Sequence, residues 1–294
     1  NPLCDHLDDS ENVTVSNIDE IENIHDLIEI GKTYHCKMNT FYKGLDLKLL
    51  FNLVEPLTEL DNMIGLNNVK VKIVDQILFF LQGFNQQEQC NICNNCIFKL
   101  PCDNKKIDML HTIITGPPGV GKTQLARIIG KIYSGMGVLS KGTFTEVSRS
   151  DLIAKYLGQT AIKTQQTIDR CKGGVMFIDE AYSLGHKEGR DSFAKECLDT
   201  LNKNLSENRD LLCIIAGYEK DLDNCFFSMN PGLKRRFTFR YNISGYNYKE
   251  LLDIFKLKIT NDDWSLDLTD EENHQLEKLF KTYTTAKANK PNLK

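Results

Sequence analysis

The stretch that decides the fold is Gly116-Pro117-Pro118-Gly119-Val120-Gly121-Lys122-Thr123, which fits the phosphate-loop pattern G-x-x-x-x-G-K-[ST] at every required position. Residues 111–115 before it, His-Thr-Ile-Ile-Thr, are predicted to form a buried strand. Residues 124–132 after it place apolar side chains at the spacing of a helix. A surface turn that held a lysine by chance would lack both neighbours, so the context predicts a triphosphate site.

The loop also predicts how its ligands are held. Glycines let backbone N–H groups point inward at the positive end of a helix, where they can surround a polyphosphate. We expect Lys122 to reach the β- and γ-phosphates of ATP and the Thr123 hydroxyl to bind Mg²⁺. The other loop residues expected to contact the nucleotide are Pro118, Gly119, Val120, Gly121 and Gln124.

A second motif follows about 60 residues later, where the apolar run 173–178 ends in Asp179-Glu180. A buried strand rarely ends in adjacent carboxylates unless they meet a cation or a reactive water, although strand-end turns also accept acids. We expect Asp179 to hold Mg²⁺ through water, and Glu180 to orient or deprotonate the water that attacks the γ-phosphate.

The composition excludes several classes of protein. With 294 residues the chain is long enough for one or two domains, and it has no apolar run of about 18 residues and no signal-like start. The first 31 residues contain nine acids and no Lys or Arg, and the mild basic excess elsewhere is not a nucleic-acid footprint. Because ATP is an intracellular ligand, we expect a reducing, cytoplasmic location, with most scattered cysteines as core residues.

Changes of pattern along the chain predict four parts. The strands of a parallel α/β core are expected near residues 110–115, 143–148, 174–179, 211–216 and 236–241, with amphipathic helices after them. Pro56 is expected to mark a break, with a weak helix near 18–30 before it and a helix at about 68–84 after it. The parts are an acidic, partly disordered or loosely helical extension (1–55), a linker helix with a Cys-rich insertion (56–106, insertion 90–102), an α/β nucleotide-binding core (107–243) and an incomplete helical lid (244–294) whose second helix is capped at residues 269–272.

Taken together, these motifs resemble those of AAA+ ATPases, and within them the branch of red-type rubisco activases and stage V sporulation protein K. The resembling run covers about residues 57–260, most of the chain. Besides the phosphate loop, the matching segments are Met63–Leu66 with Val69 and Lys70, Gly137–Leu139, Tyr156–Thr160, Phe177–Leu184, Ala216–Tyr218 and Asn230–Phe237. The resemblance implies a five-stranded parallel sheet, ATP hydrolysis and a small all-α lid that ends before the family's second sensor arginine.

The resemblance also implies roles for individual residues. Ile64 and Gly65 would line the adenine pocket, and Tyr218 falls where many relatives have a polar sensor, often Asn. Arg236 matches the arginine finger that acts on the ATP of a neighbouring subunit, which implies a ring of identical subunits, usually a hexamer. Arg235 stands where relatives often carry Ser, so it remains open which arginine reaches across.

Tyr156-Leu157-Gly158 matches the family's pore loop, in which an aromatic residue grips a polypeptide. The alternative is that Tyr156 and Leu157 pack a helix end. The first hypothesis is therefore an ATP-driven protein remodeller. A nucleic-acid motor or loader is less favoured, because Lys155 and Lys163 are the only basic residues near the loop. A third hypothesis is a nucleotide-gated scaffold with little turnover.

Four cysteines form a separate cluster that the resemblance does not require: Cys90, Cys93, Cys96 and Cys102. Thiolates at this spacing can form a structural Zn²⁺ site. Free thiols and an iron–sulfur cluster remain alternatives, although the last spacing fits a cluster poorly.

Overall fold

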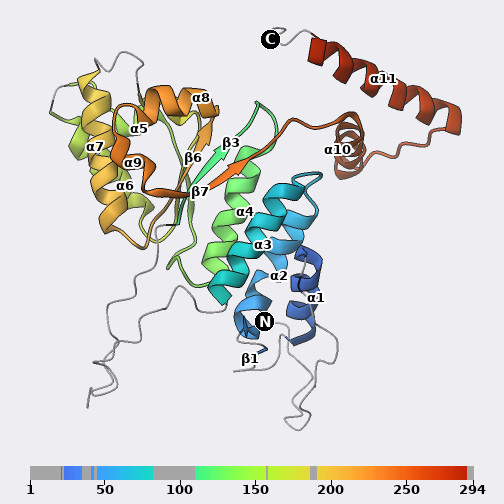
Figure 1. Ribbon diagram of the computed structural model, residues 1–294, viewed down its shortest axis with the longest axis horizontal. Helices are drawn as coiled ribbons and strands as arrows, with labels where there is room; N and C mark the ends of the chain where they lie inside the picture. The colour runs from blue at the N-terminus through green and yellow to red at the C-terminus, as the bar shows by residue number, and fades with distance from the viewer. Residues whose placement is uncertain are drawn as a thin grey trace.

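Five parallel strands form the central sheet of the protein, in the order β4-β5-β6-β3-β7 (Figure 1). The computed structural model describes residues 21, 23–34, 41–42, 45–81, 110–156, 158–185 and 191–289. The strands are β3 (His111–Thr115), β4 (Phe144–Val147), β5 (Val175–Ile178), β6 (Leu212–Gly217) and β7 (Phe237–Asn242), with a short antiparallel pair β1 (Phe41–Tyr42) and β2 (Leu45–Asp46) outside the sheet. The predicted α/β fold is confirmed, and each predicted strand lies within one residue of its expected limits.

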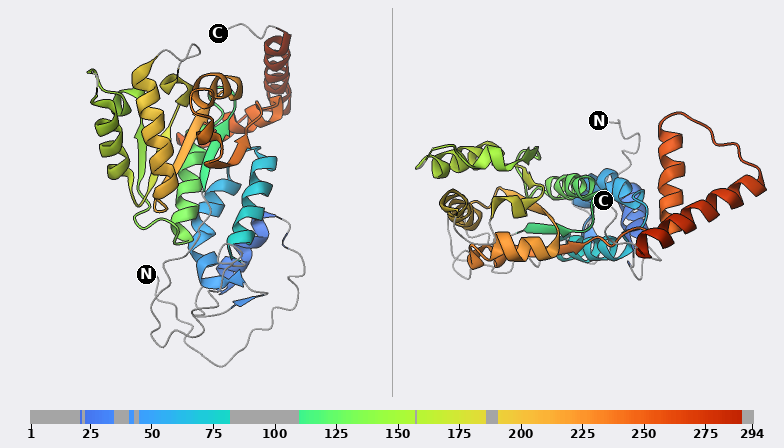
Figure 2. Two further views of the ribbon diagram at one scale, coloured as in Figure 1. Left: turned by 60° about the vertical axis from the view of Figure 1, so that its left-hand side comes forward. Right: turned by 90° about the horizontal axis from the view of Figure 1, so that it is seen from above.

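Helices cover both faces of the sheet. Helices α1 to α4 contribute to the core on one face, and α5, α6, α7 and α9 to the core on the other (Figures 1 and 2). The helices are α1 (Ile24–Tyr34), α2 (Leu47–Asp61), α3 (Asn67–Leu81), α4 (Lys122–Gly135), α5 (Arg149–Leu152), α6 (Thr160–Cys171), η3 (Ala181–Leu184), α7 (Ser192–Glu207), α8 (Glu219–Asp221), η4 (Leu222–Phe227), α9 (Pro231–Lys234), α10 (Tyr248–Asn261) and α11 (Asp270–Asn289).

The strands divide their side chains between the two cores. On β5, Val175 and Phe177 pack with the α1–α4 core, whereas Met176 and Ile178 pack with the other. This follows because successive side chains of a strand point to opposite faces of the sheet. Strands β3, β5 and β6 are buried along their whole length, while the edge strands β4 and β7 also carry exposed positions. Strands β5 and β6 therefore read as continuous apolar runs in the sequence, whereas β3 also buries His111, Thr112 and Thr115.

Helix α2 continues through Pro56, so the break predicted at this proline is wrong. A proline within a helix has no N–H to donate to the carbonyl four residues earlier, which here belongs to Asn52. Leu53, Leu57 and Leu60 are fully buried in the core that α2 shares with α1 and α4. Each buried leucine contributes about 1.5–3 kcal/mol, whereas an interior proline costs about 3 kcal/mol. Burial of the leucine face therefore outweighs the local effect of Pro56.

Helix α1 packs against α2 and belongs to the same core. Ile24, Leu27 and Ile28 of α1 are buried there. This helix corresponds to the one expected near residues 18–30, but it lies further along the chain. The predicted limit between residues 55 and 56 falls inside α2, which runs across it without interruption. The other limits of the four parts stay predictions.

Helices α10 and α11 lie beyond the sheet and cross each other at an angle (Figures 1 and 2). Phe255 of α10 and Phe280 of α11 lie with their ring centroids 5.6 Å apart. The predicted cap of α11 is confirmed, because the Thr269 N–H donates to the Glu272 carboxylate (2.8 Å) and the Glu272 N–H donates to the Thr269 hydroxyl (3.4 Å). In the part of the chain that the structure describes, no helix has both the length and the hydropathy needed to cross a membrane.

A buried polar network connects α3 to the helix that follows the phosphate loop. The side-chain amide of Gln76 on α3 donates to the Tyr133 hydroxyl on α4. The Tyr241 hydroxyl on β7 donates to the carbonyl oxygen of the same side chain at 2.5 Å. All three side chains are buried, so these hydrogen bonds satisfy polar groups that water does not reach. Helices α3 and α4 and strand β7 are thereby held in a fixed relation.

His111 begins β3 and is almost fully buried. Its Nδ1 accepts a hydrogen bond from the Cys213 N–H (3.1 Å), so the ring proton lies on Nε2 and is donated to the Leu205 carbonyl (3.0 Å). Burial, aided by the nearby charge of Arg236, lowers the pKa of His111 to about 4, although the bond to Leu205 acts in the opposite direction. His111 is therefore a neutral group that joins β3, β6 and α7.

This burial predicts acid sensitivity. The unfolded chain binds a proton at His111 below about pH 6.5, whereas the folded chain resists protonation until about pH 4. Stability should be complete above pH 7 and should decrease by about 2 kcal/mol as the pH falls toward 4.5. His111→Gln can still accept and donate but does not titrate, so it should lose less stability over this range. Urea unfolding of both proteins at several pH values measures the difference; equal slopes would contradict the prediction.

Candidate functional site

The loop of residues 116–121 connects β3 to α4 through glycines in left-handed conformations. Gly119 has φ 75° and Gly121 has φ 85°, a region that favours glycine. Among the described residues, no heavy atom lies within 4 Å of a Cβ added at Gly119, so the space above the loop is open. The first turn of α4 contains no acid, so no negative side chain there offsets the positive end of the helix dipole. The loop is therefore a backbone cradle suited to an anion.

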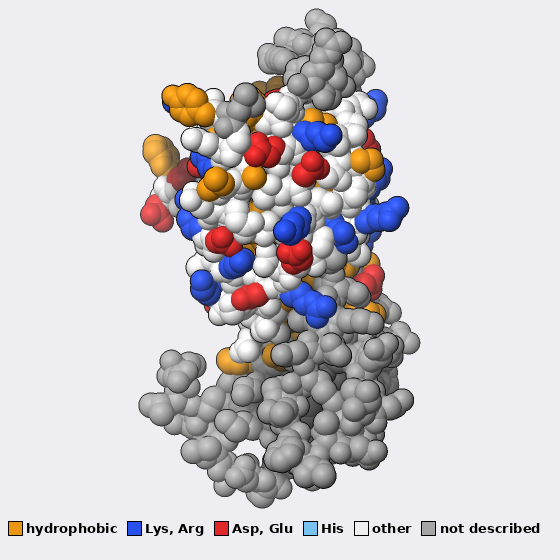
Figure 3. All heavy atoms as spheres, turned by 90° about the vertical axis from the view of Figure 1, so that its left-hand side faces the viewer, with side chains coloured by type: hydrophobic (Ala, Val, Ile, Leu, Met, Phe, Trp, Pro, Cys, Tyr) orange, Lys and Arg blue, Asp and Glu red, His pale blue; other side chains and the backbone are white. Residues whose placement is uncertain are grey.

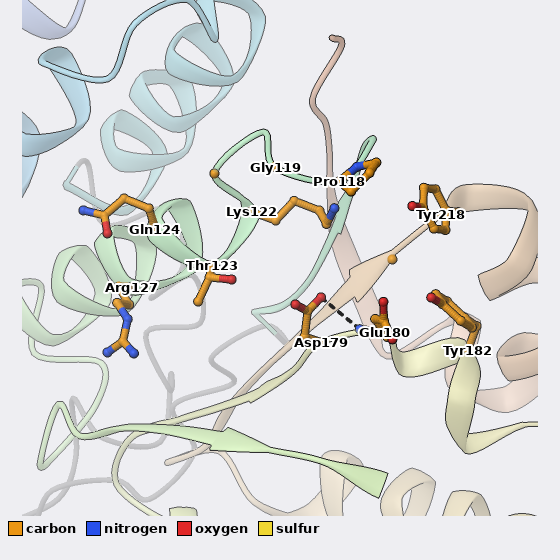
Figure 4. Close-up of a pocket in the computed structure, with 12 residues that line it drawn as sticks. Pro118, Gly119, Lys122, Thr123, Gln124, Arg127, Asp179, Glu180, Tyr182 and Tyr218 are labelled. Carbon is orange, nitrogen blue, oxygen red and sulfur yellow. Dashed lines mark hydrogen bonds between the residues drawn. The ribbon is translucent and has the colours of Figure 1, made fainter. Parts of the chain in front are cut away.

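A cavity of about 430 Å³ lies over this loop and brings the two sequence motifs together (Figure 4). It is the space in which the loop, the end of β5 and the end of β6 meet. Its lining residues are Pro118, Gly119, Gly121, Lys122, Thr123, Gln124, Arg127, Asp179, Glu180, Tyr182, Gly217 and Tyr218. Three of the predicted nucleotide-binding residues, Ile64, Gly65 and Val120, do not line it.

The side chain of Lys122 is held by its own loop. Its ammonium group donates to the carbonyl oxygens of Gly116 (3.1 Å) and Pro117 (2.9 Å). It also lies 5.8 Å from the centre of the Tyr218 ring, a cation–π contact. Figure 4 shows Lys122 pointing across the cavity toward the side where Tyr218 lies. The ammonium group is thus already inside the cavity, where it could exchange these carbonyls for phosphate oxygens.

Asp179 and Glu180 follow the buried strand β5, and both are exposed to solvent. The Asp179 carboxylate accepts a hydrogen bond from the Glu180 N–H (2.9 Å). Glu180 has φ 49° and ψ 43°, a left-handed conformation that is uncommon for a residue other than glycine. Figure 4 places both acids on the side of the cavity opposite the loop, facing Thr123 and Lys122. The hydroxyl and carboxylate oxygens are donors that suit Mg²⁺.

Ile64 and Gly65 lie beside the phosphate loop. A Cβ added at Gly65 would be 2.8 Å from a carboxylate oxygen of Glu250 and 3.6 Å from the Tyr246 ring. The Tyr246 hydroxyl in turn donates to the Val120 carbonyl of the loop (2.9 Å). Next to Gly65 is a second cavity of about 200 Å³, formed by Leu66, Asn67, Asn68, Val69, Asn242, Ile243, Ser244, Gly245, Tyr246 and Glu250.

Three residues of the main cavity, Arg127, Tyr182 and Gly217, were not assigned a role from the sequence. Tyr182 lies two residues after Glu180, and its ring centroid is 6.1 Å from that of Tyr218. Burial, together with a hydrogen bond to Glu180, raises the pKa of Tyr182 to about 12. Arg127 lies one helical turn after Thr123, and its guanidinium is 4.4 Å from the Phe144 ring centre. The four-residue spacing from Thr123 could have indicated Arg127, because such residues share a helix face.

The two arginines considered as a finger lie away from this cavity. Arg235 and Arg236 precede β7, which runs parallel to β3. The phosphate loop follows the carboxyl end of β3. The arginines precede the amino end of β7, so they lie at the opposite end of the strands. Arg235 is exposed, whereas Arg236 is half-buried and close enough to His111 to affect its pKa.

The predicted pore loop connects α5 to α6 at the β4 edge of the sheet. Tyr156 is 70% exposed, and Gly158 has φ 77°. Leu157 lies outside the described residues. Lys163 does not extend freely toward solvent, because its ammonium donates to the carbonyl of Ile153 (3.2 Å) and to that of Ser150.

The predicted zinc ligands, Cys90, Cys93, Cys96 and Cys102, all lie outside the described residues. Among the residues that are described, no three His, Cys, Asp or Glu side chains come together as a metal site. The four cysteines with a described environment are free thiols buried in the core, as predicted: Cys171, Cys197, Cys213 and Cys225.

Comparison with known proteins agrees with this geometry. The chain is 41% identical over 83% of its length to a cfxQ-like protein of Acanthamoeba polyphaga mimivirus, covering 56% of that protein. It is 39% identical over 75% of its length to the ESX-1 secretion system protein EccA1 of Mycobacterium tuberculosis, covering 37% of it. It is 42% identical over 53% of its length to stage V sporulation protein K of Bacillus subtilis, covering 48% of it.

The chain thus spans about half, or less, of the length of these relatives. The family described as "ATPase family associated with various cellular activities (AAA)" matches residues 112–244, from the second residue of β3 to just beyond β7. This range contains the phosphate loop, both acids and the whole lining of the main cavity. Residues 112–244 are therefore similar to the AAA family of ATPases.

Proposed function

We propose that this chain binds ATP and hydrolyses it in the cavity over the phosphate loop. The observation that supports the proposal is that this one cavity contains Lys122, Thr123, Asp179 and Glu180. These residues are a phosphate-binding lysine, two oxygen donors for Mg²⁺ and an acid that can act on water. When bound by Thr123 and Asp179, Mg²⁺ would offset negative charge on the phosphate oxygens.

The proposed reaction follows from the position of these groups. Glu180 orients a water molecule and accepts its proton while the water oxygen bonds to the γ-phosphorus. The bond from the γ-phosphorus to the bridging oxygen breaks, and its electron pair leaves with ADP. Lys122 exchanges the carbonyls of Gly116 and Pro117 for phosphate oxygens and stabilises their charge.

We further propose that an arginine of a neighbouring copy completes the site. Arg235 and Arg236 lie at the amino end of the strands, whereas the cavity lies at the carboxyl end, so neither arginine can reach the cavity of its own subunit. A ring of copies, such as a hexamer, would bring this edge of one subunit to the cavity of the next. A guanidinium there would stabilise the charge that develops on the transferred phosphoryl group. We assign this role to Arg236.

The client that we propose is a polypeptide. Tyr156 is a largely exposed aromatic residue beside Gly158, whose positive φ is accessible to glycine at little cost. Ile162, close by in sequence, is also exposed and apolar. The similarity to stage V sporulation protein K and to a cfxQ-like protein supports the rubisco activase-like branch as the chain's place within the family.

A nucleic-acid motor is the alternative, and the charges near the loop do not favour it. Of the two lysines considered, Lys163 is engaged with backbone carbonyls. On the face seen in Figure 3, basic and acidic side chains are interspersed, whereas a nucleic-acid surface needs a basic stripe. A nucleotide-gated scaffold with little turnover is the other alternative.

The first test separates ATP binding from ATP hydrolysis. Glu180→Gln should bind ATP as the wild-type chain does, but its turnover should fall at least 100-fold, because the amide cannot accept the proton from water. Lys122→Ala should lose at least tenfold in ATP affinity, while Lys131→Ala, a lysine further along α4 that pairs with Glu59, should not. Calorimetric titration and phosphate release measure the two effects. Wild-type turnover in Glu180→Gln would refute the role of Glu180.

The second test concerns the arginine. Arg236→Ala should retain ATP binding and lose at least tenfold in turnover, whereas Arg235→Ala should keep most of it. In a mixture of Arg236→Ala with Glu180→Gln chains, some sites combine an intact Glu180 with an intact Arg236 from the next subunit. Turnover should therefore exceed that of either variant alone. A mixture with no gain would argue against a shared site.

The third test concerns the client. Casein, an unfolded protein, should stimulate the ATPase activity of the wild-type chain, and single-stranded DNA should not. Tyr156→Ala should abolish the stimulation by casein and retain basal turnover. Tyr283→Ala, which removes another exposed tyrosine on α11, is the matched control and should respond as the wild type does. Stimulation by DNA alone would favour the nucleic-acid motor.

A further inference from the structure

The turn that follows Glu180 begins with a backbone conformation that needs support. Glu180 has φ 49° and ψ 43°, and such a left-handed conformation is strained for a residue with a Cβ. It persists only where the surrounding structure fixes it. The Glu180 N–H donates to the Asp179 carboxylate (2.9 Å), and the Glu180 carbonyl accepts from the Ser183 N–H (2.7 Å). The direction of the Glu180 side chain, which lines the cavity (Figure 4), therefore depends on what holds Ser183.

Arg149, the first residue of α5, holds Ser183 in place. Its guanidinium donates to the Ser183 carbonyl and, at 2.7 Å, to one carboxylate oxygen of Asp191. The other carboxylate oxygen of Asp191 accepts from the Ala194 N–H (3.0 Å) and caps α7. The Arg149 and Asp191 side chains are 38% and 23% exposed, so water and salt screen this pair less than a pair on the open surface. One side chain thus joins the turn after Glu180 to the first turn of α7.

The elements that Arg149 joins are themselves anchored in the core. Leu152 at the end of α5 and Leu184 at the end of η3 are completely buried. The Ser148 N–H donates to the Asp151 carboxylate (2.9 Å), which caps the start of α5 and fixes the backbone that carries Arg149. A guanidinium is planar and has five N–H donors, so it can satisfy two acceptors in one fixed geometry. The point charge of a lysine cannot reproduce this geometry.

We propose that Arg149 is a positioning residue for Glu180: its guanidinium fixes the Ser183 carbonyl and thereby the turn that presents the Glu180 carboxylate to the attacking water. This inference rests on the proposed hydrolysis of ATP. Arg149 is not among the residues that line the cavity, so it acts through the turn and not on the nucleotide. Loss of Arg149 should therefore reduce turnover and leave the affinity for ATP unchanged.

Arg149→Ala removes both hydrogen bonds of the guanidinium. We expect kcat for ATP to fall about tenfold, while KM stays within about twofold, because the groups that bind phosphate are left intact. Arg149→Lys keeps the charge and can bond to one of the two acceptors, so its kcat should lie between those of Arg149→Ala and the wild type. Lys172→Ala is the matched control. It removes another cation that pairs with an aspartate, Asp169 (2.7 Å), and its kcat and KM should equal those of the wild-type chain.

Asp191→Asn tests the same contact with a smaller change. The amide oxygen can still accept from the Ala194 N–H, so α7 keeps its cap, but the charge that holds Arg149 is lost. We expect kcat to fall about threefold at constant KM. Because Asp191 is inferred to act on Glu180 only through Arg149, the double variant Arg149→Ala/Asp191→Asn should have the kcat of Arg149→Ala alone. A loss equal to the product of the two single losses would overturn this series of contacts.

Amide hydrogen exchange tests the position of the turn without turnover. In nucleotide-free Arg149→Ala, the N–H groups of Ser183 and Gly185 should exchange about tenfold faster than in the wild type, because the turn opens locally. The amides of the buried strands β3 and β6 should exchange at the wild-type rate. Equal acceleration in the turn and in these strands would show a general loss of stability and would refute the positioning role.

The outcomes distinguish this inference from the proposed function. If the wild-type chain hydrolyses ATP and Arg149→Ala has the same or a higher kcat, the positioning role is refuted and the proposed function stands. A rise in KM at constant kcat would likewise refute it, since it would place Arg149 in binding. If the wild-type chain does not hydrolyse ATP, the proposed function and the catalytic part of this inference both fall, and hydrogen exchange still decides whether Arg149 fixes the turn.

Discussion

The parallel pairing of β3 with β6 is the constraint on which the cavity depends. Thr115, the last residue of β3, lies opposite Gly217, the last residue of β6, and the Gly116 N–H reaches the Gly217 carbonyl at 3.4 Å. Because β5 pairs with β6 in the same direction, its carboxyl end comes to the same edge. The phosphate loop, the two acids and the tyrosines therefore meet at the carboxyl end of the sheet, although they are far apart in the sequence. A register slip of one residue would exchange the side chains that face the two cores and would also separate these groups.

The groups that could act on a nucleotide are already held by the chain itself. Lys122 is bound by loop carbonyls, and the Asp179 carboxylate accepts from a backbone N–H. Beneath them, Gln76 connects α3, α4 and β7 through two buried hydroxyls. Such a site requires little reorganisation when a ligand enters, which is the condition under which fixed charges and donors are most effective.

The sequence predicted those features whose cause is local. Strands β5 and β6 are apolar runs because both of their faces are buried, and the phosphate loop needs its glycines wherever it occurs. Pro56 was misjudged because the leucines that keep α2 helical are effective only through contacts with α1 and α4. No pattern in the sequence indicated Tyr182. It lines the cavity because η3 packs beside the end of β6, where Gly217 and Tyr218 lie. The proposed roles of Arg236 and Tyr156 depend on contacts with other chains, and a single sequence or fold does not describe such contacts.

The two bonds of Arg149 have a consequence for movement within the domain. Its guanidinium joins α5, which precedes the segment with Tyr156, to the carbonyl of Ser183 and to Asp191, the N-cap of α7. A displacement of the turn after Glu180 must either carry α5 with it or break charge-assisted hydrogen bonds. Arg149 thus connects the turn that follows the acids to α5 and to the first turn of α7.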